Sequence, residues 1–186
     1  MRYLLTFILL SILSSTAFAA DYRGACTIVF QASSTLHDFQ GKASCRPFTA
    51  GIIDGVVEMS QLSVAVADMD TDNAKRDKEM REMFDHKKYP LITGSAGSVA
   101  LKDIGASAKK GAKSATKVGF NLKIREVVKP VTATVTDFTE TDARITAKLA
   151  FTLSLADYQL KPPSVLGVIR VDDKVSVTAT IVLDAE

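Results

Sequence analysis

Strict alternation of apolar and polar side chains is the feature that most restricts how this chain can fold. In the run 174–184, Val175 and Val177 share one face, while Ser176 and Thr178 share the other. A period of two with one polar face is typical of antiparallel β-sheet that is wetted on one side. The segments with a strand pattern are 25–33, 38–48, 51–59, 61–68, 92–101, 117–126, 131–138, 144–155 and 174–184.

A chain of about eight such strands cannot leave long open edges, because exposed strand edges pair with other chains and aggregate. Sheets of this size avoid open edges by closing into a barrel or by splitting into a sandwich. The pattern therefore predicts an all-β antiparallel fold, and it leaves barrel and sandwich open as alternatives.

Residues 74–86 break the strand pattern, because their charges are dense and their apolar residues follow a helical spacing. Met80, Met83 and Phe84 fall at i, i+3 and i+4, which places them on one stripe of a helix. Pro90 ends any helix before the next apolar run. We predict one short amphipathic helix here, and the open end of a barrel is the surface that its stripe can cover.

The first 19 residues have the features of a cleavable signal peptide. Arg2 supplies a positive start, residues 3–13 are apolar, and Ala17-Phe18-Ala19 offers a small-residue cleavage site. The apolar run is too short to span a bilayer. We expect a secreted, periplasmic protein whose residues 20–186 form a single domain of sufficient size to bury a large core.

Charge argues against one class of partner. After removal of Arg2 with the leader, 22 basic residues face 21 acidic ones. A balance so close to zero does not favour nucleic acid as a partner, because binding to phosphates needs an excess of cations.

The two cysteines can form a disulfide. If Thr35-Leu36 is the tip of a hairpin, Cys26 and Cys45 lie opposite each other on its two strands. Outside the cytoplasm such a pair oxidises. A structural disulfide is our main prediction, and a reactive redox pair is the alternative, although the CxxC spacing of redox motifs is absent.

The segment Asp103–Lys117 is small, polar and rich in lysine, and it predicts a surface hairpin loop. A second interpretation is a weak attraction for phospholipid headgroups or a ligand diphosphate, which would give transient contact with a membrane surface.

A series of short motifs runs through the chain. They are Ser34-Thr35-Leu36-His37-Asp38-Phe39-Gln40-Gly41, Asp70-Thr71-Asp72-Asn73 with Arg76-Asp77, Met83-Phe84-Asp85, Lys88-Tyr89-Pro90-Leu91-Ile92, Gly119-Phe120-Asn121-Leu122 with Ile124, and Lys129-Pro130-Val131. In these motifs and in their order the chain resembles the YceI-like family. The Arg-Asp, Phe-Asp and Tyr-Pro elements are the most specific part of the resemblance.

This resemblance implies a lipocalin-like antiparallel β-barrel of about eight strands, with the helix at about 74–86 near its mouth. It further implies an apolar cavity that holds a polyisoprenoid-type lipid, such as a quinone or a polyprenyl phosphate, in the periplasm. A carrier of this kind needs no catalysis, so we predict no enzyme activity, no cofactor and no metal. The sequence gives no indication of the oligomeric state.

The inward positions of the strands and of the helix supply the predicted site residues. The expected ligand-binding residues are Phe30, Met80, Met83, Phe84, Phe120, Leu122, Leu149, Phe151, Val177 and Ile181. Residues expected to bind a headgroup or to anchor the helix as a lid are His37, Arg76 and Asp77. Small inward residues expected to leave room for a ligand are Ala43, Ala133, Ala147 and Ala179.

Two other functions remain open on the sequence. One is an isomerase or hydrolase that acts on a lipophilic substrate, although no spacing singles out an acid–base pair. The other is a barrel with a filled interior that binds a partner in a stress or electron-transfer system. A zinc site could be drawn from His37 and His86 with nearby aspartates, but the usual ligand spacings are absent.

Overall fold

The computed structural model describes residues 20–108, 116–162, 164–165 and 169–186. The predicted signal peptide, 1–19, lies outside the described residues, and so does the lysine-rich part of the predicted surface loop at 109–115.

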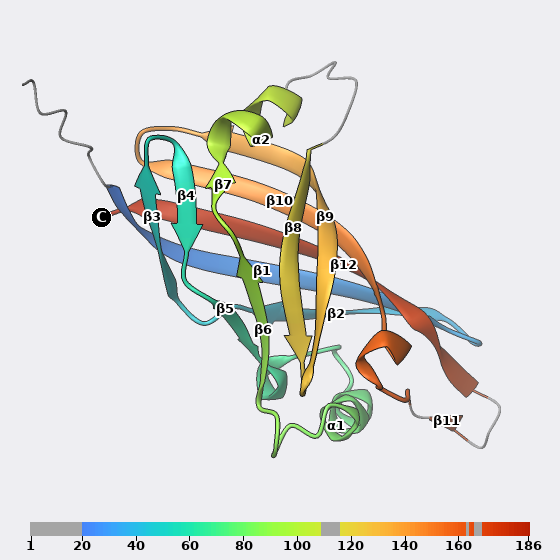
Figure 1. Cartoon of the computed structure of the whole chain (residues 1–186). Coiled ribbons are helices and arrows are strands. Elements are labelled where there is room, and N and C mark those ends of the chain that lie inside the picture. The colour runs from blue at the N-terminus through green and yellow to red at the C-terminus, as the bar shows by residue number, and fades with distance from the viewer. Residues whose placement is uncertain (1–19, 109–115, 163, 166–168) are drawn as a thin grey trace, which may run out of the picture.

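The described residues form one mostly antiparallel sheet of twelve strands with two α-helices and two 3-10 turns (Figure 1). The strands are β1 (Ala20–Ser34), β2 (Asp38–Ser44), β3 (Phe48–Ile53), β4 (Val56–Met59), β5 (Leu62–Ala65), β6 (Leu91–Ala96), β7 (Val99–Ala100), β8 (Lys117–Ile124), β9 (Val127–Glu140), β10 (Arg144–Ser154), β11 (Ser164–Val165) and β12 (Ile169–Ala185). The helices and turns are η1 (Val66–Asp68), α1 (Ala74–Met83), α2 (Leu101–Ala108) and η2 (Ala156–Tyr158). None of these helices has the length and hydropathy needed to cross a bilayer.

The strand pairing curls the sheet into a lipocalin-like barrel. Its order is β5-β6-β8-β9-β10-β12-β1-β3-β4-β7, with β2 on β1 and β11 on β12. The two ends of this path meet, because β7 follows β6 after two residues and pairs with β4. Toward the other end of the barrel, Cys45 after β2 bridges to Val64 of β5. The predicted barrel is therefore confirmed.

The structure has more strands than the expected eight, because the predicted strands 51–59 and 92–101 are each divided in two and β11 adds a further short strand. The predicted strand 51–59 is a hairpin of β3 and β4, turned at Asp54 and Gly55. Both residues have positive φ, 52° and 74°, as Asp-Gly has in the tight turns that join neighbouring strands. The Asp54-Gly55 dipeptide was the sequence signal that could have divided this predicted strand into two.

Helix α1 agrees closely with the predicted helix. It begins after Asn73, whose side-chain oxygen accepts hydrogen bonds from the backbone N–H groups of Lys75 and Arg76. It ends at Met83 rather than near residue 86, because Asp85 adopts a left-handed φ of 51°. Such a residue stops a helix by turning the chain away from its axis.

The surface hairpin predicted for Asp103–Lys117 is wrong in its described first part. The chain forms α2 there, with Leu101 and Ile104 buried one turn apart. These two side chains supply the apolar face that a short helix needs for packing, and their spacing fits a helix better than a loop.

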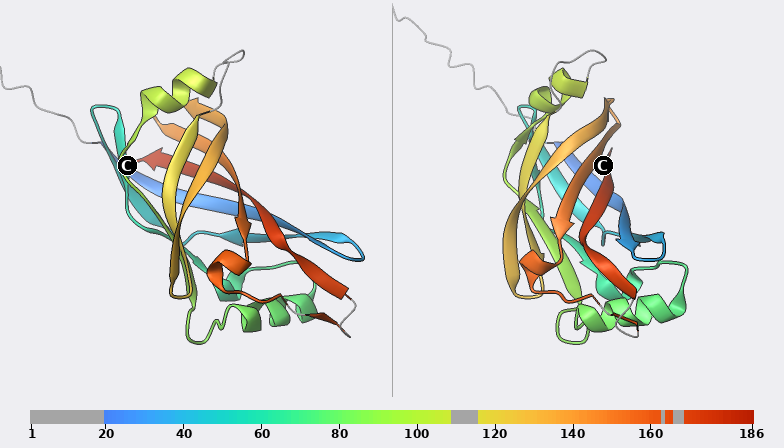
Figure 2. Two further views of the ribbon diagram at one scale, coloured as in Figure 1. Left: turned by 45° about the vertical axis from the view of Figure 1, so that its right-hand side comes forward. Right: turned by 90° about the vertical axis from the view of Figure 1, so that its right-hand side faces the viewer.

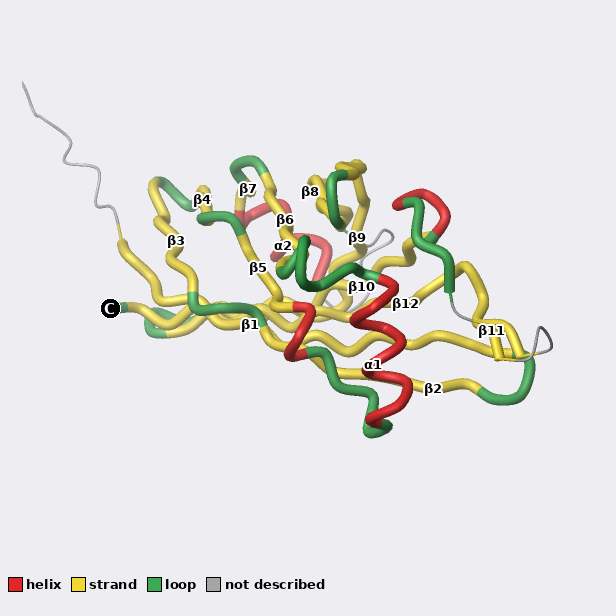
Figure 3. Tube along the Cα trace, turned by 90° about the horizontal axis from the view of Figure 1, so that it is seen from below, coloured by secondary structure: helices red, strands yellow, loops and turns green. Residues whose placement is uncertain are grey.

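The two helices cover opposite ends of the barrel, which have different interiors (Figure 2). At the α2 end, Leu101 packs into a core cluster with Tyr22, Phe48, Ile181 and Leu183. At the α1 end a second cluster surrounds Met80 and Phe84 of the helix. Seen from below, α1 lies across the end of the barrel (Figure 3).

The predicted disulfide is confirmed. Strands β1 and β2 pair with Ser33 opposite Asp38, the register expected for a tip at Thr35-Leu36. Cys26 and Cys45 form a disulfide with their Cα atoms 5.1 Å apart. Because Cys45 also bridges to β5, the bond lies at the seam that closes the barrel.

Candidate functional site

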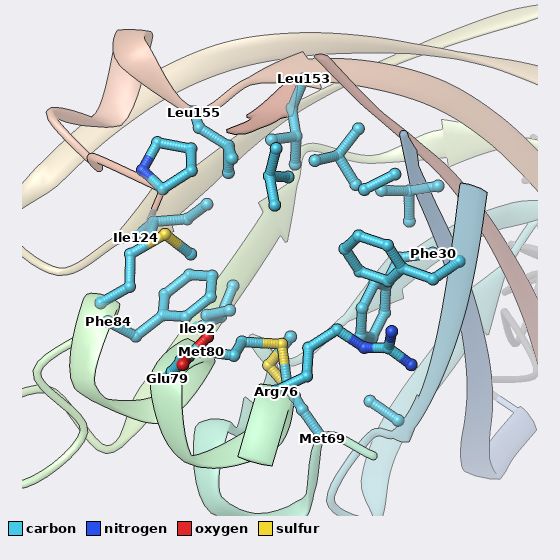
Figure 4. Close-up of a pocket in the computed structure, with 18 of the residues that line it drawn as sticks. Phe30, Met69, Arg76, Glu79, Met80, Phe84, Ile92, Ile124, Leu153 and Leu155 are labelled. Carbon is cyan, nitrogen blue, oxygen red and sulfur yellow. The ribbon is translucent and has the colours of Figure 1, made fainter. Parts of the chain in front are cut away.

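A cavity of about 330 Å³ occupies the barrel at the α1 end (Figure 4). Its volume is within the range of about 300–1,000 Å³ that is usual for small-molecule sites. Alternate residues of the surrounding strands face it, such as Phe30 and Ala32 of β1 and Val175 and Val177 of β12. The inward faces of the strands therefore form its wall, and α1 forms its cover.

Seven of the ten residues predicted to bind a ligand line this cavity. They are Phe30, Met80, Met83, Phe84, Leu122, Phe151 and Val177. Whether they bind a ligand stays a prediction, but the structure brings them together around one space.

The other three predicted ligand-binding residues do not line this cavity. Phe120 packs edge-to-face on Phe151, with ring centroids 5.3 Å apart and planes at 75°. Leu149 and Ile181 belong to the cluster beneath α2. Alternation predicts which face of the sheet a residue is on, but it does not predict the depth of that residue along the barrel axis.

Further residues that line the cavity were not among the ten predicted to bind a ligand. They are Ile28, Ala32, Phe39, Ala43, Val64, Met69, Ile92, Ile124, Leu153, Leu155, Pro162, Val171 and Val175. Alternation was an available signal for many of these, because they precede or follow selected residues by two positions. Of the four small residues expected to leave room, Ala43 faces the cavity.

Among the residues whose side chains the structure describes, the polar lining residues come from two segments. Ser34 and His37 belong to the β1–β2 hairpin, and Asn73, Lys75, Arg76 and Glu79 belong to α1 and its cap. The other lining residues within the described ranges are apolar. A molecule that fits this cavity therefore has an apolar body and meets polar groups beside the hairpin and the start of α1.

Arg76 is held in place at this polar side. Its Nε donates to Thr71 Oγ1 at 2.9 Å, and its Nη2 donates to the Thr71 carbonyl oxygen at 2.6 Å. Its guanidinium lies 4.4 Å from the centre of the Phe39 ring, within the range of a cation–π contact. The described residues place no carboxylate in a salt bridge with Arg76, so its positive charge is available to a ligand.

Asp77 is not among the lining residues of the cavity and is 6% exposed. Its Oδ1 accepts hydrogen bonds from the Thr71 backbone N–H at 2.9 Å and from the Thr71 hydroxyl at 2.6 Å. These bonds fasten the first turn of α1 to the segment before it. The geometry fits the anchoring role predicted for Asp77 and leaves it out of reach of a ligand.

The two histidines lie on separate segments. His37 is exposed on the β1–β2 hairpin at the cavity, where its carbonyl oxygen accepts a hydrogen bond from the Ser34 hydroxyl. His86 follows α1, and its Nδ1 lies 3.3 Å from the Arg81 carbonyl oxygen. Across the described ranges, no three acidic, histidine or cysteine side chains group closely enough to hold a metal ion.

The segment after α1 is attached to the β8–β9 turn. Lys88 Nζ and Arg125 Cζ lie 4.9 and 5.4 Å from the centre of the Tyr89 ring. Lys88 also pairs with Glu126 at 3.8 Å. Hydrogen bonding to Tyr89, followed by the charge of Lys88, lowers the pKa of Glu126. These groups are exposed, so this attachment is weaker than the buried one at Asp77.

Comparisons with known proteins agree with this fold. A family model described as the YceI-like domain matches residues 14–183. A polyisoprenoid-binding domain from Saccharophagus degradans, implicated in plant cell wall breakdown, superposes with a TM-score of 0.61 and 18% identity, covering 91% of this chain and 100% of that one. BcnA from Burkholderia cenocepacia superposes with a TM-score of 0.59 and 14% identity, covering 84% and 95%. No curated protein matches the chain.

Proposed function

We propose, on the premise that this chain belongs to the YceI-like domain family, that its cavity binds the tail of a polyisoprenoid-type lipid. The observation that carries the proposal is the distribution of polarity around the cavity. Among the lining residues that the structure describes, the wall is apolar and the polar side chains belong to the β1–β2 hairpin and to α1 with its cap. An amphiphile with an apolar chain and one polar end matches this distribution.

Burial of the tail supplies the binding energy in this proposal. Each CH₂ group removed from water contributes about 0.8 kcal/mol, so a tail of a few isoprene units binds without any charged contact. Met80 and Met83 of α1 suit such a ligand, because unbranched thioether side chains adapt to irregular apolar shapes. Helix α1 then acts as a lid, fastened through Asp77.

The headgroup in this proposal meets Arg76 at the polar side of the cavity. A guanidinium donates hydrogen bonds to a phosphate or to a carbonyl oxygen, so a polyprenyl phosphate and a quinone both satisfy it. The contacts of Arg76 with Thr71 and Phe39 hold it there before a ligand arrives.

The relatives support this ligand class, since the domain from Saccharophagus degradans is described as polyisoprenoid-binding. We propose binding rather than catalysis, because a carrier needs only the cavity and its polar side. The sequence left open a barrel with a wholly filled interior. The α1 end does not fit that alternative, because it contains the cavity.

We further propose that the protein works in the periplasm, on the basis of the signal-peptide pattern in residues 1–19. Expression of the full chain should yield a periplasmic form whose intact mass begins at Ala20. An intact mass that retains the first residues, together with recovery in the cytoplasm, would contradict this location.

The ligand is tested by mass spectrometry of an organic extract from protein purified from the organism that produces it. We expect a prenyl lipid in the wild-type extract. The Ala43→Phe variant places a ring in the cavity and should lose this lipid, because Ala43 faces the space. Ser44→Phe is the matched control, since the neighbouring residue is exposed on the outer face and its extract should keep the lipid.

Thermal denaturation of both variants separates loss of the ligand from loss of the fold. If Ala43→Phe fails to fold, Ala32→Phe tests the same wall from β1. A wild-type extract without prenyl lipid, or retention of the lipid by a folded Ala43→Phe protein, would count against the proposal.

A further inference from the structure

A second hollow of about 270 Å³ lies between β7 and β8, nearer to α2 than the main cavity. It forms where the wall of the barrel divides. Strand β8 pairs with β6 as far as Phe120 opposite Ala96, and the chain then continues into β7, which pairs with β4 instead. Figure 1 shows β7 and β8 diverging toward α2. Both Val118 and Gly119 line the hollow, although successive strand residues face opposite sides of a sheet.

The inward-facing residues of β8 extend from the main cavity to the second hollow. Leu122 and Ile124 line the main cavity, and Val118 lines the second hollow. Phe120 lies between them on the same face and lines neither space. Its ring contacts Phe151, which does line the main cavity, at 5.3 Å between centroids. The Phe120 side chain therefore lies where it can separate the main cavity from the second hollow.

The strand opposite this ring leaves room for it. Among the described residues, a Cβ atom placed on Gly94 of β6 would meet one neighbouring side chain within 4 Å, that of Phe120, at 3.9 Å from its Cδ2 atom. Phe120 itself is only half-buried although it faces the interior. The ring thus closes the interior without being tightly packed from the β6 side.

We infer that the Phe120 ring separates the main cavity from the hollow at the gap between β7 and β8 and thereby limits the length of the chain that the protein binds. This inference rests on the proposed binding of a linear isoprenoid tail. A tail longer than the main cavity meets the Phe120–Phe151 pair and can continue toward the gap between β7 and β8 only if the Phe120 ring is displaced or removed.

The test is a comparison of linear prenyl alcohols of increasing length, namely farnesol, geranylgeraniol and solanesol, on delipidated full-length mature protein. Native mass spectrometry gives the affinity for each. In the wild type, affinity should stop rising once the main cavity is filled. In Phe120→Ala the rise should extend to longer alcohols, by about tenfold for every two further CH₂ groups buried.

Two further variants make the result specific. Phe138→Ala removes a ring of the same size from a residue that packs near α2 and lines neither space, so it should keep the wild-type length preference. Gly94→Phe in the Phe120→Ala background refills the gap from β6 and should restore the wild-type limit. Phe120→Leu replaces Phe120→Ala if the smaller residue does not allow folding, and it should move the limit in the same direction.

The outcomes separate the inference from the function on which it rests. A wild-type protein that binds none of the three alcohols would overturn both. A wild-type protein that binds them, with an unchanged length preference in Phe120→Ala, would overturn the role of Phe120 alone.

Discussion

At the scale of single residues, Thr71 connects two neighbours of opposite charge at the start of α1. Its hydroxyl accepts from Arg76 Nε and donates to Asp77 Oδ1. The buried carboxylate secures the helix, while the half-buried guanidinium stays at the polar side of the cavity. One threonine therefore positions both the anchor of the lid and the group that we propose for the headgroup.

Asp77→Ala should lower the free energy of unfolding by about 2 kcal/mol, because it leaves the buried N–H and hydroxyl of Thr71 without their acceptor. Urea denaturation measures the change. Glu82→Ala on the same helix is the control, since Glu82 is exposed and pairs with Lys78 at 3.9 Å, and it should change the free energy by less than about 0.5 kcal/mol. Equal effects of the two substitutions would argue against Asp77 as the anchor.

At the scale of elements, the β1–β2 hairpin carries three features that depend on one register. The pairing of Ser33 with Asp38 places Cys26 opposite Cys45, puts His37 beside the cavity and turns Phe30 inward. The sequence predicted this register because the two cysteines and the hairpin tip gave independent constraints that agreed. A slip of one residue would reverse the faces of the strand and separate the cysteines.

Replacing both Cys26 and Cys45 by serine should cost about 3 kcal/mol of stability, because the bond restricts a loop of this size in the unfolded chain. Urea midpoints of the variant and of the wild type, each with and without reductant, measure the effect. Reductant should lower the midpoint of the wild type toward that of the variant and leave the variant unchanged. Equal midpoints for the oxidised wild type and the variant would show that the bond contributes nothing to stability.

Sequence periodicity was sufficient to predict some helices and strands but not others. Helix α1 was predictable because its apolar stripe and the proline after it are both local signals. Helix α2 was missed because Leu101 and Ile104 are the buried residues of its described side chains, 101–105, within a segment dominated by small and charged residues. The division of β3 from β4 depended on two residues, Asp54 and Gly55, inside a segment whose alternation is otherwise that of one strand.

At the scale of the whole molecule, the two ends of the barrel have different interiors, apart from the hollow in the wall between β7 and β8. The α2 end is packed around Phe48 and Leu183, and the α1 end encloses the cavity. The sequence predicted the inward faces, but Phe120, Leu149 and Ile181 show that it could not divide them between the two ends. Depth along the barrel depends on strand tilt and on where β7 leaves β6, which are long-range properties of the sheet.

The most direct test of a hollow end that holds a lipid is a crystal structure of the protein purified, without delipidation, from the organism that produces it. We predict continuous tubular density from the polar side at Arg76 and His37 inward to Phe151, with α1 closed over it. Inward-turned side chains that fill this space, or a space with no chain-shaped density, would contradict the account.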